Sequence, residues 1–294
     1  MIDLHIHSTK SDGSETPEDL VQMGARAGLT AMALTDHDTM DGAEEFLAAC
    51  RVNGMTGIAG IELSADVGDS NGTLHILGYG LNPEYPELLE NLEKVQSGRM
   101  WRNEQIVERL NALGLEMEWT EVEDCAQEDV IGRVHIAQAL INRDYVSSIP
   151  EAFEKYLGKG APAYVGRYHL YPEECIRLIR AAGGAAVVAH PITWEEEPEE
   201  LEAGLRRLKD AGLYGLEVIH SDIPYEQVIT LMRMAKRLDL HLTGGSDFHG
   251  APKPEVVMGH GYGRAEISDE YLYPLLEAIH GTENPQVVLG KKFR

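Results

Sequence analysis

Short apolar runs recur along the chain, and most are followed by a segment with the hydrophobic period of an amphipathic helix. Such runs predict buried strands, and their alternation with helices is typical of parallel β/α units. Strands are expected at residues 2–6, 30–35, 58–64, 74–79, 185–189, 215–219 and 241–244. This rhythm predicts an α/β fold and favours a barrel-like sheet of these seven strands over an open sheet.

Helical periodicity fills most intervals between these strands. After the first strand, Thr16 is a candidate N-cap, Pro17 suits the first helical position, and acidic residues follow in the first turn. Further helices are expected at residues 42–52, 173–182, 201–211 and 225–238. Residues 88–162 break the rhythm, because they show helical periodicity without a convincing strand. We therefore expect a barrel formed by residues 1–87 and 163–294, with a helical insertion at residues 88–162.

Composition narrows the classes of partner and compartment. The 294 residues include 25 Lys+Arg and 49 Asp+Glu, which gives a formal net charge of −24. Because proteins bind nucleic acid mainly through basic residues, this charge argues against long duplex DNA and, among nucleic-acid partners, favours small nucleotides or very short oligomers. The chain contains no run of about 18 apolar residues, so the sequence predicts no membrane helix, and the first residues lack a secretory signal pattern. Three widely spaced cysteines fit neither a disulfide framework nor a thiolate metal site, so a cytoplasmic location is expected.

Histidines and carboxylates collect at the ends of the predicted strands. His5 and His7 alternate along the first strand, so both rings point to the same side, and the turn at Ser11-Asp12-Gly13 can return Asp12 to that place. Parallel β/α folds gather functional groups at the carboxyl ends of their strands. The residues expected to converge there are His5, His7, Asp12, His37, Glu62, His75, His190, Asp247 and His249.

This set predicts a metal site rather than a collection of structural histidines. Any one of these histidines would ordinarily be structural, but ligand-competent residues recur at the ends of successive strands. Imidazole and carboxylate without thiolate suit divalent metals such as manganese, zinc or iron, and we expect manganese, with magnesium as a further candidate. Bound cations would also turn a negative pocket into a phosphate site.

Several of these segments together resemble the motifs of the PHP (polymerase and histidinol phosphatase) phosphoesterase family. The resemblance extends from the first residues to about Gly250. The segments that carry it are Asp3-Leu4-His5-Ile6-His7-Ser8, Ser11-Asp12-Gly13, Thr35-Asp36-His37-Asp38, Gly60-Ile61-Glu62, His75-Ile76-Leu77-Gly78-Tyr79, Ala189-His190-Pro191 and Gly245-Ser246-Asp247-Phe248-His249. The family implies a distorted seven-stranded β/α barrel with a trinuclear metal site.

The resemblance also implies how the ligands divide among three metals. It assigns one metal to His5, His7, Glu62 and Asp247, a second to Glu62, His75 and His190, and a third to Asp12, His37 and His249. Asp36 is expected to orient His37 or another ligand from behind. All nine ligand positions hold competent residues, which favours an active enzyme over a non-catalytic binding module that kept only the barrel.

Within the family, the chain most resembles the branch of nucleoside 3′,5′-bisphosphate phosphatases and ribonuclease AM, through Gly132-Arg133-Val134-His135 and Gly215-Leu216-Glu217-Val218. That branch implies release of the 3′-phosphate of adenosine 3′,5′-bisphosphate and exonuclease trimming of short RNA from 5′ to 3′. The expected mechanism is attack of a metal-bridging hydroxide on phosphorus. Residues 88–162 would then cap the active site. A histidinol-phosphate phosphatase fits the same metals and remains the alternative.

Three further residues are candidates for contact with the substrate. Arg133 suits capture of a phosphate, with His135 assisting, although a surface ion pair with Glu128 or Asp129 is the competing interpretation of this arginine. His220, after the sixth strand, is a candidate for a phosphate contact or the leaving-group acid. Asp247 or a neighbour of a ligated histidine would take the proton of the attacking water. The sequence leaves the exact substrate, the metal and the oligomeric state open.

Overall fold

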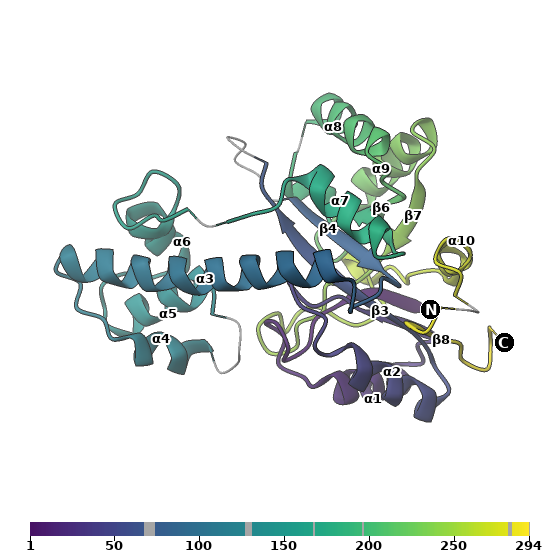
Figure 1. Ribbon diagram of the computed structural model, residues 1–294, viewed down its shortest axis with the longest axis horizontal. Helices are drawn as coiled ribbons and strands as arrows, with labels where there is room; N and C mark the ends of the chain where they lie inside the picture. Colours follow the sequence, from purple (N-terminus) through teal and green to yellow (C-terminus); the bar gives the residue numbers. More distant parts are fainter. Residues whose placement is uncertain (68–73, 127–130, 167, 196, 282–283, 294) are drawn as a thin grey trace. The chain divides into compact units, whose positions relative to one another are not determined.

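The computed structural model describes the chain except for residues 68–73, 127–130, 167, 196, 282–283 and 294, which appear as a grey trace in Figure 1. The chain forms two compact units. One unit combines Met1–Leu89 with Leu170–Arg294, and the other is Glu90–His169. None of the described helices is long and apolar enough to cross a membrane.

The first unit is built on one strongly curved sheet. Its strands follow the chain order from β1 to β7, and a parallel bridge from Ile6 to Phe248, just beyond β7, brings the two ends together. These strands are β1 (Ile2–Ile6), β2 (Ala31–Leu34), β3 (Thr56–Ala65), β4 (Leu74–Tyr79), β5 (Ala185–Val188), β6 (Gly215–Ile219) and β7 (His241–Gly244). The predicted α/β class with a seven-stranded, nearly closed sheet is therefore confirmed. An unpredicted short strand, β8 (Val287–Val288), pairs with β3.

Strand β4 departs from the parallel β/α pattern that the alternation of strands and helices indicates. This strand runs antiparallel to both β3 and β5, whereas the other neighbours from β1 to β7 are parallel. Residues 66–73 are all that separates β3 from β4, fewer than the dozen or so that a parallel crossover needs. The reversal pairs His75, near the start of β4, with Ser64, near the end of β3. His75 thus reaches the edge where the parallel strands end.

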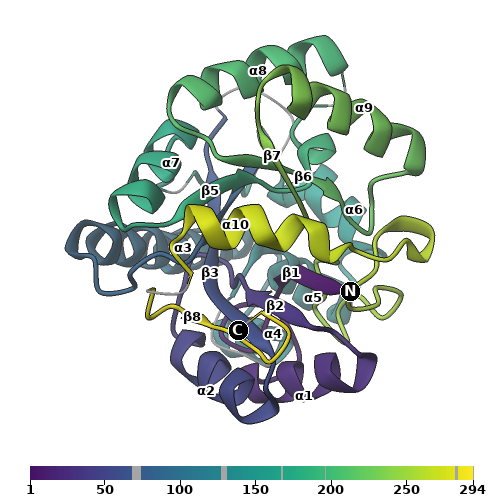
Figure 2. The same cartoon turned by 90° about the vertical axis from the view of Figure 1, so that its right-hand side faces the viewer.

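Helices flank this sheet, as Figure 2 shows. Thr16 caps the first of them as predicted, because its Oγ1 accepts a hydrogen bond from the backbone N–H of Asp19 at 3.1 Å. Leu4 and Ile58 from the strands and Leu272 from the last helix belong to one buried core. The helices are α1 (Pro17–Ala27), α2 (Ala43–Asn53), α7 (Pro172–Ala181), α8 (Pro198–Asp210), α9 (Tyr225–Arg237) and α10 (Leu272–Ala278), with short helical turns at Pro191–Thr193, Tyr262–Arg264 and Asp269–Tyr271.

The second unit is helical in the part that the structure describes. Helix α3 (Pro86–Ala112) begins in the first unit and continues into the second. It is followed by α4 (Trp119–Ala126), α5 (Arg133–Asn142), α6 (Ile149–Ala152) and a π-helical turn at Phe153–Leu157. Ile106, Leu110, Val122, Ile136 and Leu140 are buried together, so this unit has a hydrophobic core of its own.

Candidate metal centre

Five histidine rings surround the buried carboxylate of Glu62, which lies on β3. Its Oε2 atom lies near His5 Nε2 at 3.3 Å, His7 Nε2 at 3.2 Å and His37 Nδ1 at 3.0 Å. Its Oε1 atom lies near His75 Nδ1 at 2.9 Å and His190 Nε2 at 3.0 Å. The two oxygens therefore serve different sets of rings, so this one carboxylate can bridge two metal ions.

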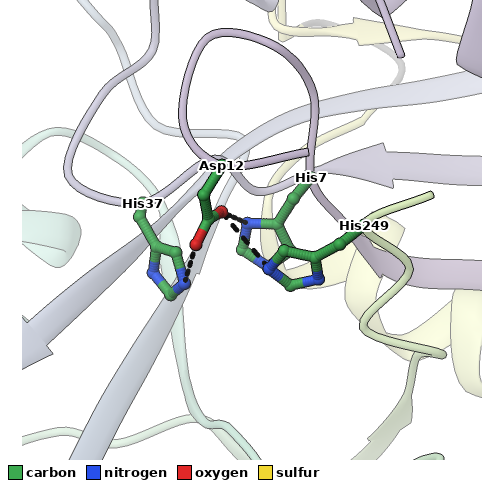
Figure 3. A group of neighbouring side chains, drawn as sticks. All are labelled: His7, Asp12, His37 and His249. Atoms are coloured by element: carbon green, nitrogen blue, oxygen red, sulfur yellow. Dashed lines mark ion pairs between the residues drawn. The ribbon is translucent and has the colours of Figure 1, made fainter. Parts of the chain in front are cut away.

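Asp12 lies at the centre of a second group of candidate metal ligands, drawn in Figure 3. Its carboxylate lies between the His37 ring on one side and the His7 and His249 rings on the other. The distances are 3.7 Å to His37 Nε2, 3.7 Å to His7 Nδ1 and 3.2 Å to His249 Nε2. These donor atoms are close enough together to hold one cation.

Asp247, just after β7, completes the group around His5 and His7. Its Oδ1 atom lies 3.1 Å from His7 Nε2 and 3.4 Å from His5 Nε2. The same oxygen is 3.5 Å from His249 Nδ1. Donor atoms of His5, His7, Glu62 and Asp247 are close enough together for one ion, and they come from three different strand ends.

Three residues at this edge adopt backbone conformations that side chains rarely take. Asp38 has φ 55°, His190 has φ 24° and Asp247 has φ 59°. Positive φ is uncommon outside glycine, and such strained residues cluster at functional sites, where the surrounding structure holds them in place. The sharp turns after β5 and β7 direct the side chains of the ligands His190 and Asp247 to one place. The turn after β2 contains Asp38, which is not among the predicted ligands.

The donor set fits divalent cations by a direct structural criterion. Buried polar atoms almost always have a hydrogen-bond partner. Five buried atoms of this cluster have none among the residues that the structure describes: His5 Nε2, both ring nitrogens of His7, His37 Nδ1 and Glu62 Oε2. Each points into the cluster as a lone-pair donor or a carboxylate oxygen, which are the ligands that borderline divalent metals prefer.

The electrostatics of the cluster favour bound cations as well. Burial disfavours the ionised form of Glu62, but His37, His75 and His5 hold the pKa of this carboxyl well below its usual range. The pKa of Asp247 is likewise lowered, because nearby histidines outweigh its burial. Burial lowers the pKa of His37 to about 3, so this ring stays neutral. Burial also disfavours the charged form of His7, but Asp247 and Glu62 raise the pKa of this ring to about 10. The pKa values of His5 and His75 are raised as well, so a bound cation would displace protons from these rings. Ionised carboxylates and neutral imidazole are the forms that bind metal.

Asp36 supports the cluster from behind. Its Oδ1 atom accepts hydrogen bonds from the Ser8 backbone at 2.6 Å and from Ser11 Oγ at 2.8 Å, and its Oδ2 accepts from Ser8 Oγ at 2.7 Å. These contacts stabilise the turn that leads to Asp12. Asp36 therefore holds the segment from Ser8 to Ser11, which leads directly to the ligand Asp12.

His220, which follows β6, is buried beside Asp247. The backbone N–H of Asp222 donates to His220 Nδ1 at 3.0 Å, so in the neutral ring the proton resides on Nε2. That Nε2 atom faces Asp247 Oδ2 at 3.4 Å. A pocket opens at this point, lined by His37, Glu62, His75, His190, Thr193, His220, Asp222, Asp247 and Lys253.

Arg133 and His135 lie in the other unit, at the start of α5. Arg133 donates to the carbonyl of Leu157 at 3.1 Å, and its guanidinium lies over the rings of Phe153 (5.3 Å) and Tyr164 (5.8 Å). His135 Nδ1 accepts from the backbone N–H of Gly132. Their contact with substrate stays a prediction. The competing partners Glu128 and Asp129 lie outside the described residues.

Two side chains that contact the cluster were given no role from the sequence, although Glu217 lies in one of the segments that carry the family resemblance. Glu217 on β6 is fully buried, accepts a hydrogen bond from the His190 backbone at 2.7 Å, and lies 3.0 Å from His5 Nδ1. It thus fixes the His5 ring with Nε2 toward the cluster, as carboxylates often do for metal-binding histidines. The available signal was an acid inside an otherwise apolar strand. Lys253, whose Nζ contacts Asp247 Oδ2 at 2.5 Å, had no comparable signal.

Comparison with known proteins agrees with this geometry. Residues 3–158 match the PHP domain family. A 3′,5′-nucleoside bisphosphate phosphatase from Chromobacterium violaceum is 32% identical over 265 residues, covering 88% of this chain and 90% of that protein. A 5′-3′ exoribonuclease from Haemophilus influenzae is 32% identical over 247 residues, covering 84% and 89%.

A solved structure is similar over nearly the whole chain. It is a putative metal-dependent phosphoesterase from Bifidobacterium adolescentis, with a TM-score of 0.79 and 31% identity, covering 94% of this chain and 96% of that one. The family resemblance noted in the sequence is therefore confirmed. The chain belongs to the PHP domain family, and the histidine–carboxylate cluster lies in a metal-dependent phosphoesterase.

Proposed function

We propose that this protein removes the 3′-phosphate from adenosine 3′,5′-bisphosphate and trims short RNA from 5′ to 3′. The observation that carries the proposal is Glu62, whose two oxygens face separate groups of histidines beside a pocket. A phosphate monoester offers several oxygens to neighbouring cations, so this arrangement suits it. The net charge of −24 favours a nucleotide or a very short oligomer over a long polyanion.

The chain's own residues would divide the chemistry as follows. His5, His7, Glu62 and Asp247 would hold one divalent cation, with His75 and His190 joining Glu62 at a second. The third predicted group is His37, Asp12 and His249. When bound, these cations supply Lewis acidity toward phosphoryl oxygens and lower the pKa of water, and manganese is our proposed metal. Glu217 holds the His5 ring in the required orientation.

His220 would act on the leaving group. Its Nδ1 atom already accepts a hydrogen bond from the Asp222 backbone, so the proton on Nε2 faces the pocket beside Asp247. A proton at that position can be transferred to the oxygen that departs from phosphorus. Asp247, which lines the same pocket with its Oδ2 atom 3.4 Å from His220 Nε2, would accept the proton of the attacking water.

The deciding experiment compares substrates after manganese loading and after chelation. Phosphate release from adenosine 3′,5′-bisphosphate should depend on metal and should greatly exceed release from histidinol phosphate. Chelation should reduce the rate to background, and added manganese should restore it. Preference for histidinol phosphate would contradict the nucleotide proposal and support the alternative. Loss of phosphate from the 5′ position would also contradict it. The two possible products, adenosine 5′-monophosphate and adenosine 3′-monophosphate, have the same mass, so chromatography against standards of both identifies the position.

Arg133 provides a separate test of how the second phosphate is bound. We expect Arg133→Ala to raise KM for the bisphosphate by about tenfold to a hundredfold, because a charge-assisted hydrogen bond to phosphate contributes about 1.5–3 kcal/mol. KM for an aryl phosphate, which lacks a second phosphate, should change little. Steady-state kinetics on both substrates measures the difference.

Two controls keep this prediction interpretable. Arg133 packs against Phe153 and Tyr164, so thermal unfolding must show that the variant is folded. Arg206→Ala, which removes an exposed arginine of α8, should leave both KM values unchanged. Equal increases in KM for the two substrates would count against a phosphate contact at Arg133.

A further inference from the structure

Lys253 brings a fixed positive charge to the pocket beside the histidine cluster. Among the described residues that line this pocket, it contributes the one lysine or arginine side chain. Its ammonium contacts Asp247 Oδ2 at 2.5 Å, whereas Asp247 Oδ1 faces His5 and His7. A lysine ammonium is ordinarily ionised at neutral pH. The Lys253 ammonium therefore contacts the histidine–carboxylate cluster through Asp247 and also lines the pocket.

The lysine keeps hydrogen-bonding capacity for a ligand. An ammonium group has three N–H donors. In the described part of the chain, Nζ makes one hydrogen bond, to Asp247, which leaves two donors. The side chain is 37% exposed, so it is reached from solvent through the pocket.

The backbone holds Lys253 in place before any ligand arrives. Pro252 and Pro254 flank it, and proline restricts both its own φ and the conformation of the preceding residue. The Lys253 N–H donates to the carbonyl of Gly250 at 3.1 Å, and the neighbouring Ala251 N–H donates to Ser14 Oγ at 2.9 Å. Such a restrained segment loses little conformational entropy when its side chain binds a ligand.

We propose that Lys253 binds a non-bridging oxygen of the substrate's phosphoryl group and so acts as a substrate-contacting residue of this pocket. The pocket is otherwise rich in negative charge, with Glu62, Asp222 and Asp247 in its wall. Besides the cations that these acids would hold, a phosphate dianion entering there gains from a positive partner on the protein side. The two remaining N–H donors of Lys253 can make this contact while the third stays on Asp247. This inference rests on the proposed function only in that the substrate is a phosphate ester.

The test measures phosphate binding and metal content separately from turnover. Manganese-loaded protein is titrated with inorganic phosphate by isothermal titration calorimetry, and bound manganese is counted by inductively coupled plasma mass spectrometry. Lys253→Met should weaken phosphate binding about tenfold to a hundredfold, which is the range for a hydrogen bond to a charged group. Its manganese content should equal that of the wild type. Lys253→Arg should recover most of the affinity, because it restores the charge.

A matched control removes a lysine of the same unit that lies away from the pocket. Lys236→Met on the exposed face of α9 should bind phosphate as the wild type does. Unchanged phosphate affinity in Lys253→Met would overturn the proposal. So would a parallel loss of manganese, because Lys253 would then act only by positioning Asp247. Wild-type protein that binds phosphate but does not hydrolyse the bisphosphate would contradict the proposed function alone, and the Lys253 comparison would still decide this inference.

Discussion

Replacing Glu62 with glutamine is expected to remove more than one metal ion and to reduce phosphate release at least about a thousandfold, equivalent to about 4 kcal/mol of transition-state stabilisation. The reason is geometric. Oε2 faces His5, His7 and His37, while Oε1 faces His75 and His190. Glutamine has the same shape but no charge. Its NH₂ group takes the place of one of these oxygens, and that group donates hydrogen bonds but has no lone pair with which to bind a metal.

Metal counting separates this prediction from a simple loss of activity. Purified Glu62→Gln should contain fewer manganese ions per chain than wild type, with a deficit larger than one when both are loaded identically. Circular dichroism should show an unchanged fold. Glu45→Gln, an exposed acid on α2, is the matched control and should retain full metal content and rate. A Glu62→Gln protein that keeps its full metal complement would show that this carboxylate does not bridge.

Replacing Asp247 with alanine is expected to abolish turnover while the barrel stays folded. Asp247 Oδ1 is the carboxylate oxygen that joins His5 and His7, and the lowered pKa of this group keeps it ionised at neutral pH. Its removal takes a charged ligand from one metal group and the proposed proton acceptor from the pocket. We expect a loss of at least about a thousandfold, again about 4 kcal/mol, measured by single-turnover phosphate release.

The backbone at this position dictates the choice of control. Asp247 has φ 59°, a left-handed conformation that costs alanine about 1–2 kcal/mol and that asparagine tolerates better. Asp247→Asn therefore separates loss of charge from backbone strain, and thermal unfolding should show it to be the more stable variant. Both variants should be nearly inactive. If either one lost metal yet kept wild-type turnover, Asp247 would not serve as a ligand for the chemistry.

The apolar runs were sufficient to predict the strand positions and the class of the fold. Most of the predicted strand ranges lie within one or two residues of the observed ones, because a buried strand needs a continuous apolar run whatever its neighbours are. The start of α1 was equally local, since Thr16 and Pro17 act on the first turn of their own helix. Strand direction was not local. The reversal at β4 follows from a connection too short for a crossover. The spacing of the predicted strands contains this information, but the alternation of strands and helices does not.

The amino-acid sequence by itself determined which residue types are available for chemistry. His5, His7 and Asp247 could be named in advance, because their spacing at strand ends and their resemblance to a family both concern residue identity and order along the chain. Tertiary structure decided which oxygen faces which ring. It alone brings Glu217 to His5 and Lys253 to Asp247, pairs separated by 212 and 6 residues. Closure of the sheet brings Glu217 on β6 to His5 on β1, whereas the loop after β7 folds Lys253 back onto Asp247. Hydrogen bonds depend on distances and angles in space that order along the chain does not specify.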